Sequence, residues 1–229
     1  MQGLTLVVGT KNYSSWSLRP WILMRHLGIP FAERVVHLDT PEFAAEIPKL
    51  SPSRRVPVLL HDGHPVWESL AICEYASELA GGRGWPEDPR QRAEARSLSC
   101  EMHAGFQALR SQCPMNCRAL GRRVAMTPAL EADVGRIDAI WDDCRRRHAG
   151  QGPWLFGAYG VADAMFAPVA LRCRTYGLPL GGSAAAYLAT VLEDPLLRGW
   201  LDAALAEDVI VAADEAGQDA GGPSSTAGD

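Results

Sequence analysis

The spacing of hydrophobic and polar positions predicts short strands and one helix in the first 40 residues. Leu4 to Val8 is an apolar run with β-branched residues, which is typical of a strand. Leu18, Trp21 and Ile22 follow at i, i+3 and i+4, the spacing of one face of an amphipathic helix. Phe31 to Leu38 has the pattern of a second strand. Strand, helix and strand within about 35 residues indicate a βαβ unit.

The next 40 residues predict a loop, a hairpin and a helix. The stretch with Pro41, Pro48 and Pro52 is interpreted as a loop. The runs 56–60 and 65–67 are two strands, joined by an Asp-Gly turn that favours a hairpin. Helical spacing resumes after Ser69. The order β-α-β-loop-β-β-α is that of a thioredoxin-like fold.

Beyond a glycine-rich linker the pattern becomes helical throughout. Asp88-Pro89 and Thr127-Pro128 each combine an N-cap residue with proline at the first helical position. Gly160 opens another helix, and two shorter helices are expected within 183–207. The end of the chain holds small and polar residues without a large apolar one, a composition typical of disorder. The predicted organisation is a thioredoxin-like α/β domain (1–80), a linker (81–88), an all-helical domain (89–212) and a disordered tail (213–229).

Composition excludes several classes of function. The 229-residue chain has a net charge of −5, so a basic surface for nucleic acid is not expected. No apolar run approaches the ~20 residues that span a bilayer, and the N-terminus lacks a signal peptide pattern, which predicts a cytoplasmic protein without membrane partners. The six cysteines are widely spaced and are expected to be free thiols that bind no metal.

Two serines at a strand-to-helix junction are the first candidates for chemistry. Ser14 and Ser15 place hydroxyl groups beside the unpaired N–H groups of a helix start, where an anion such as a thiolate is stabilised. Both serines are equally compatible with simple N-capping.

Two further features lie near the predicted hairpin. Pro57 stands at a strand start, and a cis Val56–Pro57 bond would leave the Val56 backbone free to pair with an extended peptide. Glu68 and Ser69 open the following helix, where a carboxylate can hold an ammonium group and a hydroxyl can hold a carboxylate. Each feature alone is also compatible with an ordinary strand start or helix cap.

In combination these motifs resemble the cytosolic glutathione transferases. The resemblance covers residues 4–80 through Ser14-Ser15 with Arg19, Val56-Pro57 and Glu68-Ser69, and continues to about 207 through the helix pattern. Gly160-Val161-Ala162-Asp163-Ala164 is similar to the capping motif of the family's second domain, in which Ser or Thr usually replaces Gly160. The serine motif is most similar to the zeta class.

The resemblance implies roles for particular residues. Ser14, with Ser15 as the neighbouring candidate, would activate the thiol of the cosubstrate glutathione. Trp16 would border the site of the electrophile. The residues implied in binding glutathione are Lys49, Arg55, Val56, Pro57, Glu68 and Ser69; Lys49 and Arg54 are alternatives for the glycine carboxylate.

The resemblance leaves three functions open. The first is conjugation of glutathione to a small hydrophobic electrophile, or glutathione-dependent peroxide reduction, with a role in detoxification. The second is zeta-like isomerisation of maleylacetoacetate, against which Arg55 and Trp16 depart from the zeta pattern. The third is a non-catalytic interaction module, which would have no need for the complete ligand set. Members of the family are usually homodimers, so a homodimer is expected.

Overall fold

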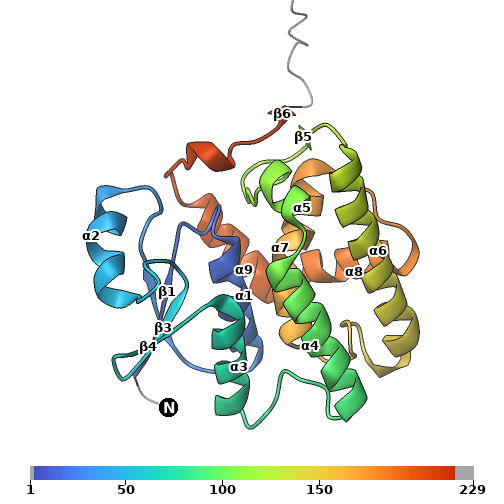
Figure 1. Cartoon of the computed structure of the whole chain (residues 1–229), viewed down its shortest axis with the longest axis horizontal. Helices are drawn as coiled ribbons and strands as arrows, with labels where there is room; N and C mark the ends of the chain where they lie inside the picture. Colours follow the sequence, from blue (N-terminus) through green and yellow to red (C-terminus); the bar gives the residue numbers. More distant parts are fainter. Residues whose placement is uncertain (1–2, 220–229) are drawn as a thin grey trace, which may run out of the picture.

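The computed structural model describes residues 3–219 and contains a four-stranded mixed sheet (Figure 1). Its strands are β1 (Leu4–Val8), β2 (Ala32–Val35), β3 (Val58–His61) and β4 (His64–Trp67). The strand order is β2-β1-β3-β4, with β1 and β2 parallel and the other neighbours antiparallel. The parallel pair requires a crossover, which α1 (Ser15–His26) supplies.

Helices cover both faces of the sheet. Leu6 and Val8 point toward α1 and α3 (Ser69–Leu79), whereas Val7 points to the opposite face, because side chains alternate along a strand. There α2 (Pro41–Leu50) packs Phe43 and Ile47 against the sheet.

Helix α2 corrects the prediction of a loop in this segment. The Thr40 hydroxyl accepts the Phe43 N–H at 3.1 Å, and Pro41 occupies the first turn, where a missing N–H costs nothing. The prolines interpreted as helix breakers therefore stand at positions that a short helix tolerates.

The second part of the chain is helical, as predicted. Its helices are α4 (Pro89–Ala104), α5 (Gln107–Gln112), α6 (Pro128–His148), α7 (Val161–Tyr176), α8 (Gly182–Glu193) and α9 (Pro195–Leu205). Helix α7 is buried along almost its whole length and contacts α1 as well as α4. Within residues 3–219, no helix combines the length and the apolar character needed to cross a membrane. The fold class is thus the predicted thioredoxin-like sheet followed by a helical part.

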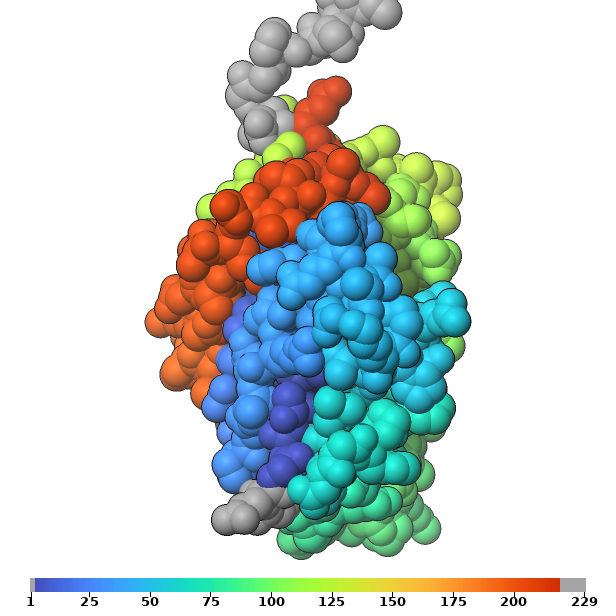
Figure 2. Space-filling model, turned by 90° about the vertical axis from the view of Figure 1, so that its left-hand side faces the viewer, coloured from blue at the N-terminus to red at the C-terminus, as the bar shows by residue number. Residues whose placement is uncertain are grey.

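The segment after α9 is ordered further than the sequence predicts. It forms a 3-10 helix (Ala212–Asp214) and the strand β6 (Gln218–Asp219), which pairs with β5 (Arg122–Arg123). It crosses the end of the sheet-containing part in Figure 2. Glu215 fixes it there by accepting hydrogen bonds from the Tyr13 hydroxyl at 2.6 Å and the Asn116 amide at 2.9 Å. The expected disorder over 213–219 is therefore wrong, and 220–229 lie outside the described residues.

The start of α7 explains the unusual glycine of the capping motif. Asp163 is buried and accepts the N–H groups of Leu155 and Gly160, and the Tyr187 hydroxyl, all within 2.9 Å. Burial raises the pKa of this carboxyl to about 6. A Cβ at Gly160 would lie 2.6 Å from the Gly84 carbonyl oxygen, which accepts the Val161 N–H at 2.8 Å. A serine or threonine cap would collide with the linker at this point.

We predict that Gly160→Ala lowers stability by about 1–3 kcal/mol, because a methyl group must displace backbone in a packed contact. Gly135→Ala is the matched control: Gly135 is exposed inside α6, a Cβ there meets nothing within 4 Å, and the change should add about 0.5–1 kcal/mol. Denaturant unfolding of both variants measures the difference. Equal stability of the two variants would contradict the steric argument.

Candidate active site

A cavity of 340 Å³ lies where the start of α1 meets the helical part. The sheet-containing part contributes the residues from Tyr13 to Trp16 together with Leu38, Phe43, Arg54, Arg55 and Val56, and the rest of the chain contributes Arg110, Pro114, Met115, Arg172 and Asp214. Apolar and cationic side chains therefore share the walls. Such a mixture suits a ligand with an apolar body and an anionic group.

The serines at the start of α1 form a chain of hydroxyl groups. Ser14 donates a 2.7 Å hydrogen bond to Ser17 Oγ, which also accepts the Gly9 N–H at 3.1 Å. The backbone N–H of Trp16 has no acceptor among residues 3–219. Ser14 and Ser15 line the cavity, so hydroxyl groups and the positive end of the helix dipole face the same space. The arrangement is suited to an anion at this point.

Ser15 differs from Ser14 in its partner. Its Oγ accepts a 3.4 Å hydrogen bond from Nη2 of Arg172, and within the described part of the chain its own proton has no acceptor. Both serines can therefore donate a proton toward the cavity, Ser15 directly and Ser14 if the bond to Ser17 reverses.

The second group of predicted residues surrounds an adjoining cavity of 60 Å³. Val56, Pro57, Glu68 and Ser69 line it together with Arg55, Ser53 and Trp16. The Val56–Pro57 peptide bond is cis, which confirms that prediction. Neither backbone polar group of Val56 has a partner among residues 3–219, so both are available to a ligand.

Two features of Glu68 and Ser69 are typical of a ligand site. The Ser69 hydroxyl is buried without a hydrogen-bond partner among the described residues, which is costly unless a ligand supplies one. Glu68 adopts a φ of 71°, in a region that non-glycine residues occupy infrequently. Its carboxylate remains half exposed, 3.8 Å from His103 Nε2.

Trp16 stands between two guanidinium groups. Arg19 lies 4.2 Å and Arg110 lies 4.7 Å from the centre of its ring. Arg19 is fully buried, donates from Nε to the Met165 carbonyl, and lines neither cavity. Burial, with repulsion from the other arginines, lowers the pKa of Arg19 well below its usual value. Trp16 lines both cavities, a position at which a bound cosubstrate and an electrophile would meet.

The structure does not bring Lys49 to this site. Its ammonium group lies on the exposed side of α2, where it pairs with Glu46 at 2.7 Å, and it lines neither cavity. The i, i+3 spacing of the two residues on one helix accounts for the pairing. Of the two residues considered for the glycine carboxylate, Arg54 is the one that reaches the larger of the two cavities.

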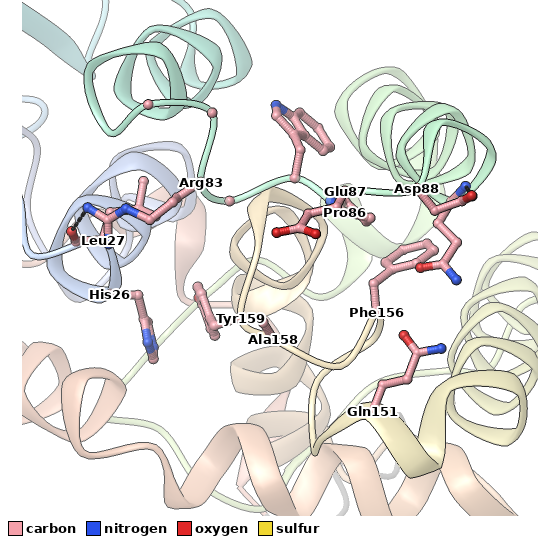
Figure 3. A pocket seen from close by; sticks show the side chains of 15 residues that line it. His26, Leu27, Arg83, Pro86, Glu87, Asp88, Gln151, Phe156, Ala158 and Tyr159 are labelled. Carbon is pink, nitrogen blue, oxygen red and sulfur yellow. Dashed lines mark hydrogen bonds between the residues drawn. The ribbon is translucent and has the colours of Figure 1, made fainter.

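A third cavity, of 710 Å³, lies on another face between the linker and the loop before α7 (Figure 3). His26 stacks on the Tyr159 ring with 3.4 Å between centroids and bonds to Asp194 at 2.8 Å. Arg83 donates to the Leu27 carbonyl at 2.9 Å. These polar groups join elements of the fold to one another. The Tyr159 hydroxyl is buried there without a hydrogen-bond partner among residues 3–219, but none of the residues predicted for the site lines this larger space.

Several residues of the site, among them Ser17, Arg110 and Arg172, were not singled out for it by the sequence. Ser17 lies one helical turn after Ser14, so its i, i+3 spacing was a signal that could have been used. Arg110 and Arg172 come from α5 and α7, and no local motif marks them. Among residues 3–219, no group of three or more His, Cys, Asp or Glu side chains could hold a metal ion.

Comparisons with known proteins agree with this geometry. A family model described as the glutathione S-transferase N-terminal domain matches residues 13–79. The chain is 31% identical over 100 residues to a probable maleylacetoacetate isomerase of Caenorhabditis elegans, which covers 43% of this chain and 46% of the relative. It is 38% identical over 134 residues to the maleylacetoacetate isomerase of Rattus norvegicus, which covers 57% and 60%. The chain thus spans about half the length of these relatives.

The fold extends the similarity over the rest of the chain. A Burkholderia glutathione transferase homolog, solved with bound glutathione, superposes with a TM-score of 0.66 at 23% identity, covering 90% of this chain and 99% of that one. At this identity the likeness concerns the fold. Taken together, residues 13–79 resemble the N-terminal domain of the glutathione S-transferases in sequence, and the chain as a whole has the fold of solved glutathione transferases.

Proposed function

We propose that this chain is a serine-type glutathione transferase that activates the thiol of glutathione for attack on a small electrophile. The observation that carries the proposal is the group of hydroxyl and backbone N–H donors at the start of α1, next to the unpaired Val56 backbone and the unpartnered Ser69 hydroxyl. Relatives named glutathione transferase and maleylacetoacetate isomerase, and a fold neighbour with bound glutathione, support it.

The peptide would extend across the two cavities. Glu68 would hold the ammonium group and Ser69 the carboxylate of the γ-glutamyl end, in the 60 Å³ cavity. The cysteinyl backbone would pair with Val56, as an added strand pairs with a sheet edge. Arg54 and Arg55 would face the glycine carboxylate. This places the thiol over Ser14 and Ser15.

Thiolate formation is the central chemical step. A free thiol has a pKa near 8.5, so little of it is ionised at pH 7. Ser17 retains a proton of its own, and it can donate to Ser14 in place of accepting from it, which frees the Ser14 proton for the sulfur. Together with the helix dipole this hydrogen bond favours the thiolate and lowers the thiol pKa. In this scheme Ser14 is the donor and Ser17 positions it.

The reaction that follows attack is best determined by an activity panel. Conjugation or peroxide reduction is the first candidate, because Trp16, Pro114 and Met115 give the cavity an apolar wall. Maleylacetoacetate isomerisation is the second, because several relatives carry that name. Glutathione assayed with an aryl halide, a hydroperoxide and maleylacetone separates these, and inactivity with all three, together with no binding of glutathione, would leave only the non-catalytic module. A homodimer, a cytoplasmic location and a role in detoxification stay predictions.

We predict that Ser69→Ala weakens glutathione binding by about 1–3 kcal/mol, the value of a hydrogen bond to a charged group. Stability should not fall, because the hydroxyl has no partner to lose within the described structure. Ser77→Ala is the control, since Ser77 is buried on the same helix and lines neither cavity. Unchanged affinity of Ser69→Ala in isothermal titration removes this residue from the site.

Ser14→Ala should raise the pKa of the bound thiol and lower turnover at neutral pH by about 10–1000-fold, on the scale of one lost anion-stabilising donor. Glutathione affinity should change little, and part of the activity should return toward pH 9. Thiolate absorbance against pH measures the shift. A larger effect of Ser15→Ala transfers the role to Ser15, and no shift in either variant leaves the Trp16 N–H as the leading donor.

The nucleophile should be the thiol of glutathione and not a cysteine of the protein. Cys100 is exposed, whereas the other five cysteines are buried, and burial raises the pKa of Cys113 to about 11 and of Cys117 to about 12. We therefore predict that a disulfide reagent modifies one thiol rapidly in the folded protein and six after denaturation. Turnover should continue after Cys100 is modified. A loss of turnover in a Cys100→Ala variant would show that a protein thiol takes part in the reaction.

A further inference from the structure

The helical wall of the 340 Å³ cavity carries cationic groups that form no close ion pair within the described part of the chain. Four arginines line the cavity, Arg54, Arg55, Arg110 and Arg172, against one carboxylate, Asp214. Within residues 3–219 none of these five groups forms an ion pair within 4.0 Å. The cavity thus has a net positive charge in a protein whose overall charge is −5.

Arg172 is the most constrained of these groups. Its side chain is only 4% exposed, and its Nε donates to the Cys113 carbonyl at 2.9 Å. Nη2 reaches Ser15 Oγ at 3.4 Å, while Nη1 is buried and has no partner in the described part of the chain. The guanidinium group is therefore held in place with donor capacity unused beside the proposed thiol position.

Arg110 occupies the same wall. Its Nε donates to the Gly105 carbonyl at 2.8 Å and its Nη2 to the Met102 and His103 carbonyls. Its Nη1 is buried and lacks a partner within residues 3–219. Arg110 from α5 and Arg172 from α7 thus both line the cavity, and each has one guanidinium nitrogen without a partner among residues 3–219.

We infer that the acceptor substrate of this site is an electrophile that carries a carboxylate, which Arg172 binds and Arg110 assists in binding. The inference rests on the proposed function. It restricts the range of expected substrates from hydrophobic electrophiles in general to those that also carry an anionic group. Guanidinium groups match the geometry of a carboxylate, and their hydrogen bonds to it are about twice as strong as neutral ones. Trp16, Pro114 and Met115 contact the apolar body of the same molecule.

Asp214 supplies a second, opposing charge. It stands on the 3-10 helix of the C-terminal segment, and burial raises the pKa of its carboxyl while Arg172 lowers it. An incoming carboxylate meets repulsion from Asp214 and attraction from Arg172. Removal of the Asp214 charge should therefore strengthen anion binding, the opposite of the effect expected at Arg172.

A matched pair of aryl halides tests the inference by turnover. In 4-chloro-3-nitrobenzoate and 4-chloro-3-nitrobenzamide the thiolate attacks the carbon that bears chlorine; a C–S bond forms, and chloride leaves with the C–Cl electron pair. After correction for the uncatalysed rates, the wild-type kcat/KM should favour the benzoate by about tenfold or more, the size of one charge-assisted hydrogen bond. Arg172→Met should bring this ratio to about one and Asp214→Asn should raise it. Arg174→Met is the control on the same helix, since Arg174 bonds to the Cys117 carbonyl and does not line the cavity.

A binding measurement separates this inference from the proposed reaction. Titration with 3-nitrobenzoate and 3-nitrobenzamide, which lack a leaving group, is performed with and without S-methylglutathione. The anion site is supported if the benzoate binds more strongly than the benzamide, and if Arg172→Met removes this preference while Asp214→Asn increases it. This result supports the anion site even if no turnover with glutathione is found. In that case only the proposed transferase reaction fails. Equal binding of the two probes, or an equal loss of both in Arg172→Met, overturns the anion site. A rise in thiol pKa in Arg172→Met without a change in the substrate ratio assigns Arg172 to the thiolate instead.

Discussion

The burial of helix α1 on almost every side is the constraint on which the rest of the structure depends. Its side chains pack against α3 and β1 within the sheet-containing part and against α7 and α9 in the helical part. Leu18, Ile22, Leu23 and Met24 are completely buried. Because the helix is fixed from both sides, its first turn is fixed as well, and the donors at Ser14 to Trp16 keep their positions at the cavity wall. Dipoles held in this way act on an anion more strongly than mobile ones in solvent.

Most of the fold could be predicted because the chain marks its elements locally. Strand alternation, helical spacing and the pairs Asp88-Pro89 and Thr127-Pro128 each carry their signal within a few residues. Helix α2 was missed because three prolines were interpreted as one loop, although the Thr40 cap and the Phe43–Ile47 spacing favour a helix. The ordered segment up to Asp219 depends on partners such as Tyr13 and Asn116, about 100 to 200 positions earlier, and no local pattern contains that information.

The residues of the candidate site also fall into those that a local pattern predicts and those that depend on distant packing. Ser14, Val56 and Ser69 were predicted as site residues because each stands at a strand-to-helix or loop-to-strand junction whose chemistry is visible in two or three residues. Arg110 and Arg172 were not, because they reach the cavity only through the packing of α5 against α6 and of α7 against α1. The chain also contains many arginines, so a further one on a helix carries little information before its burial is known.

The cost of burying a positive charge is the reason that Arg110 and Arg172 are informative about the ligand of the cavity. A guanidinium group removed from water without a carboxylate partner costs several kcal/mol, so a fold retains one only where another interaction offsets that cost. Arg19 lies 4.2 Å from the centre of the Trp16 ring and donates from Nε to Met165, although neither of its Nη atoms has a partner among residues 3–219. Arg172 is equally deep, and burial and the nearby Arg110 lower its pKa to about 10, yet it opens onto a cavity. An anionic ligand in that cavity would offset part of the cost of burying Arg172, which is the physical basis of the anion site proposed above.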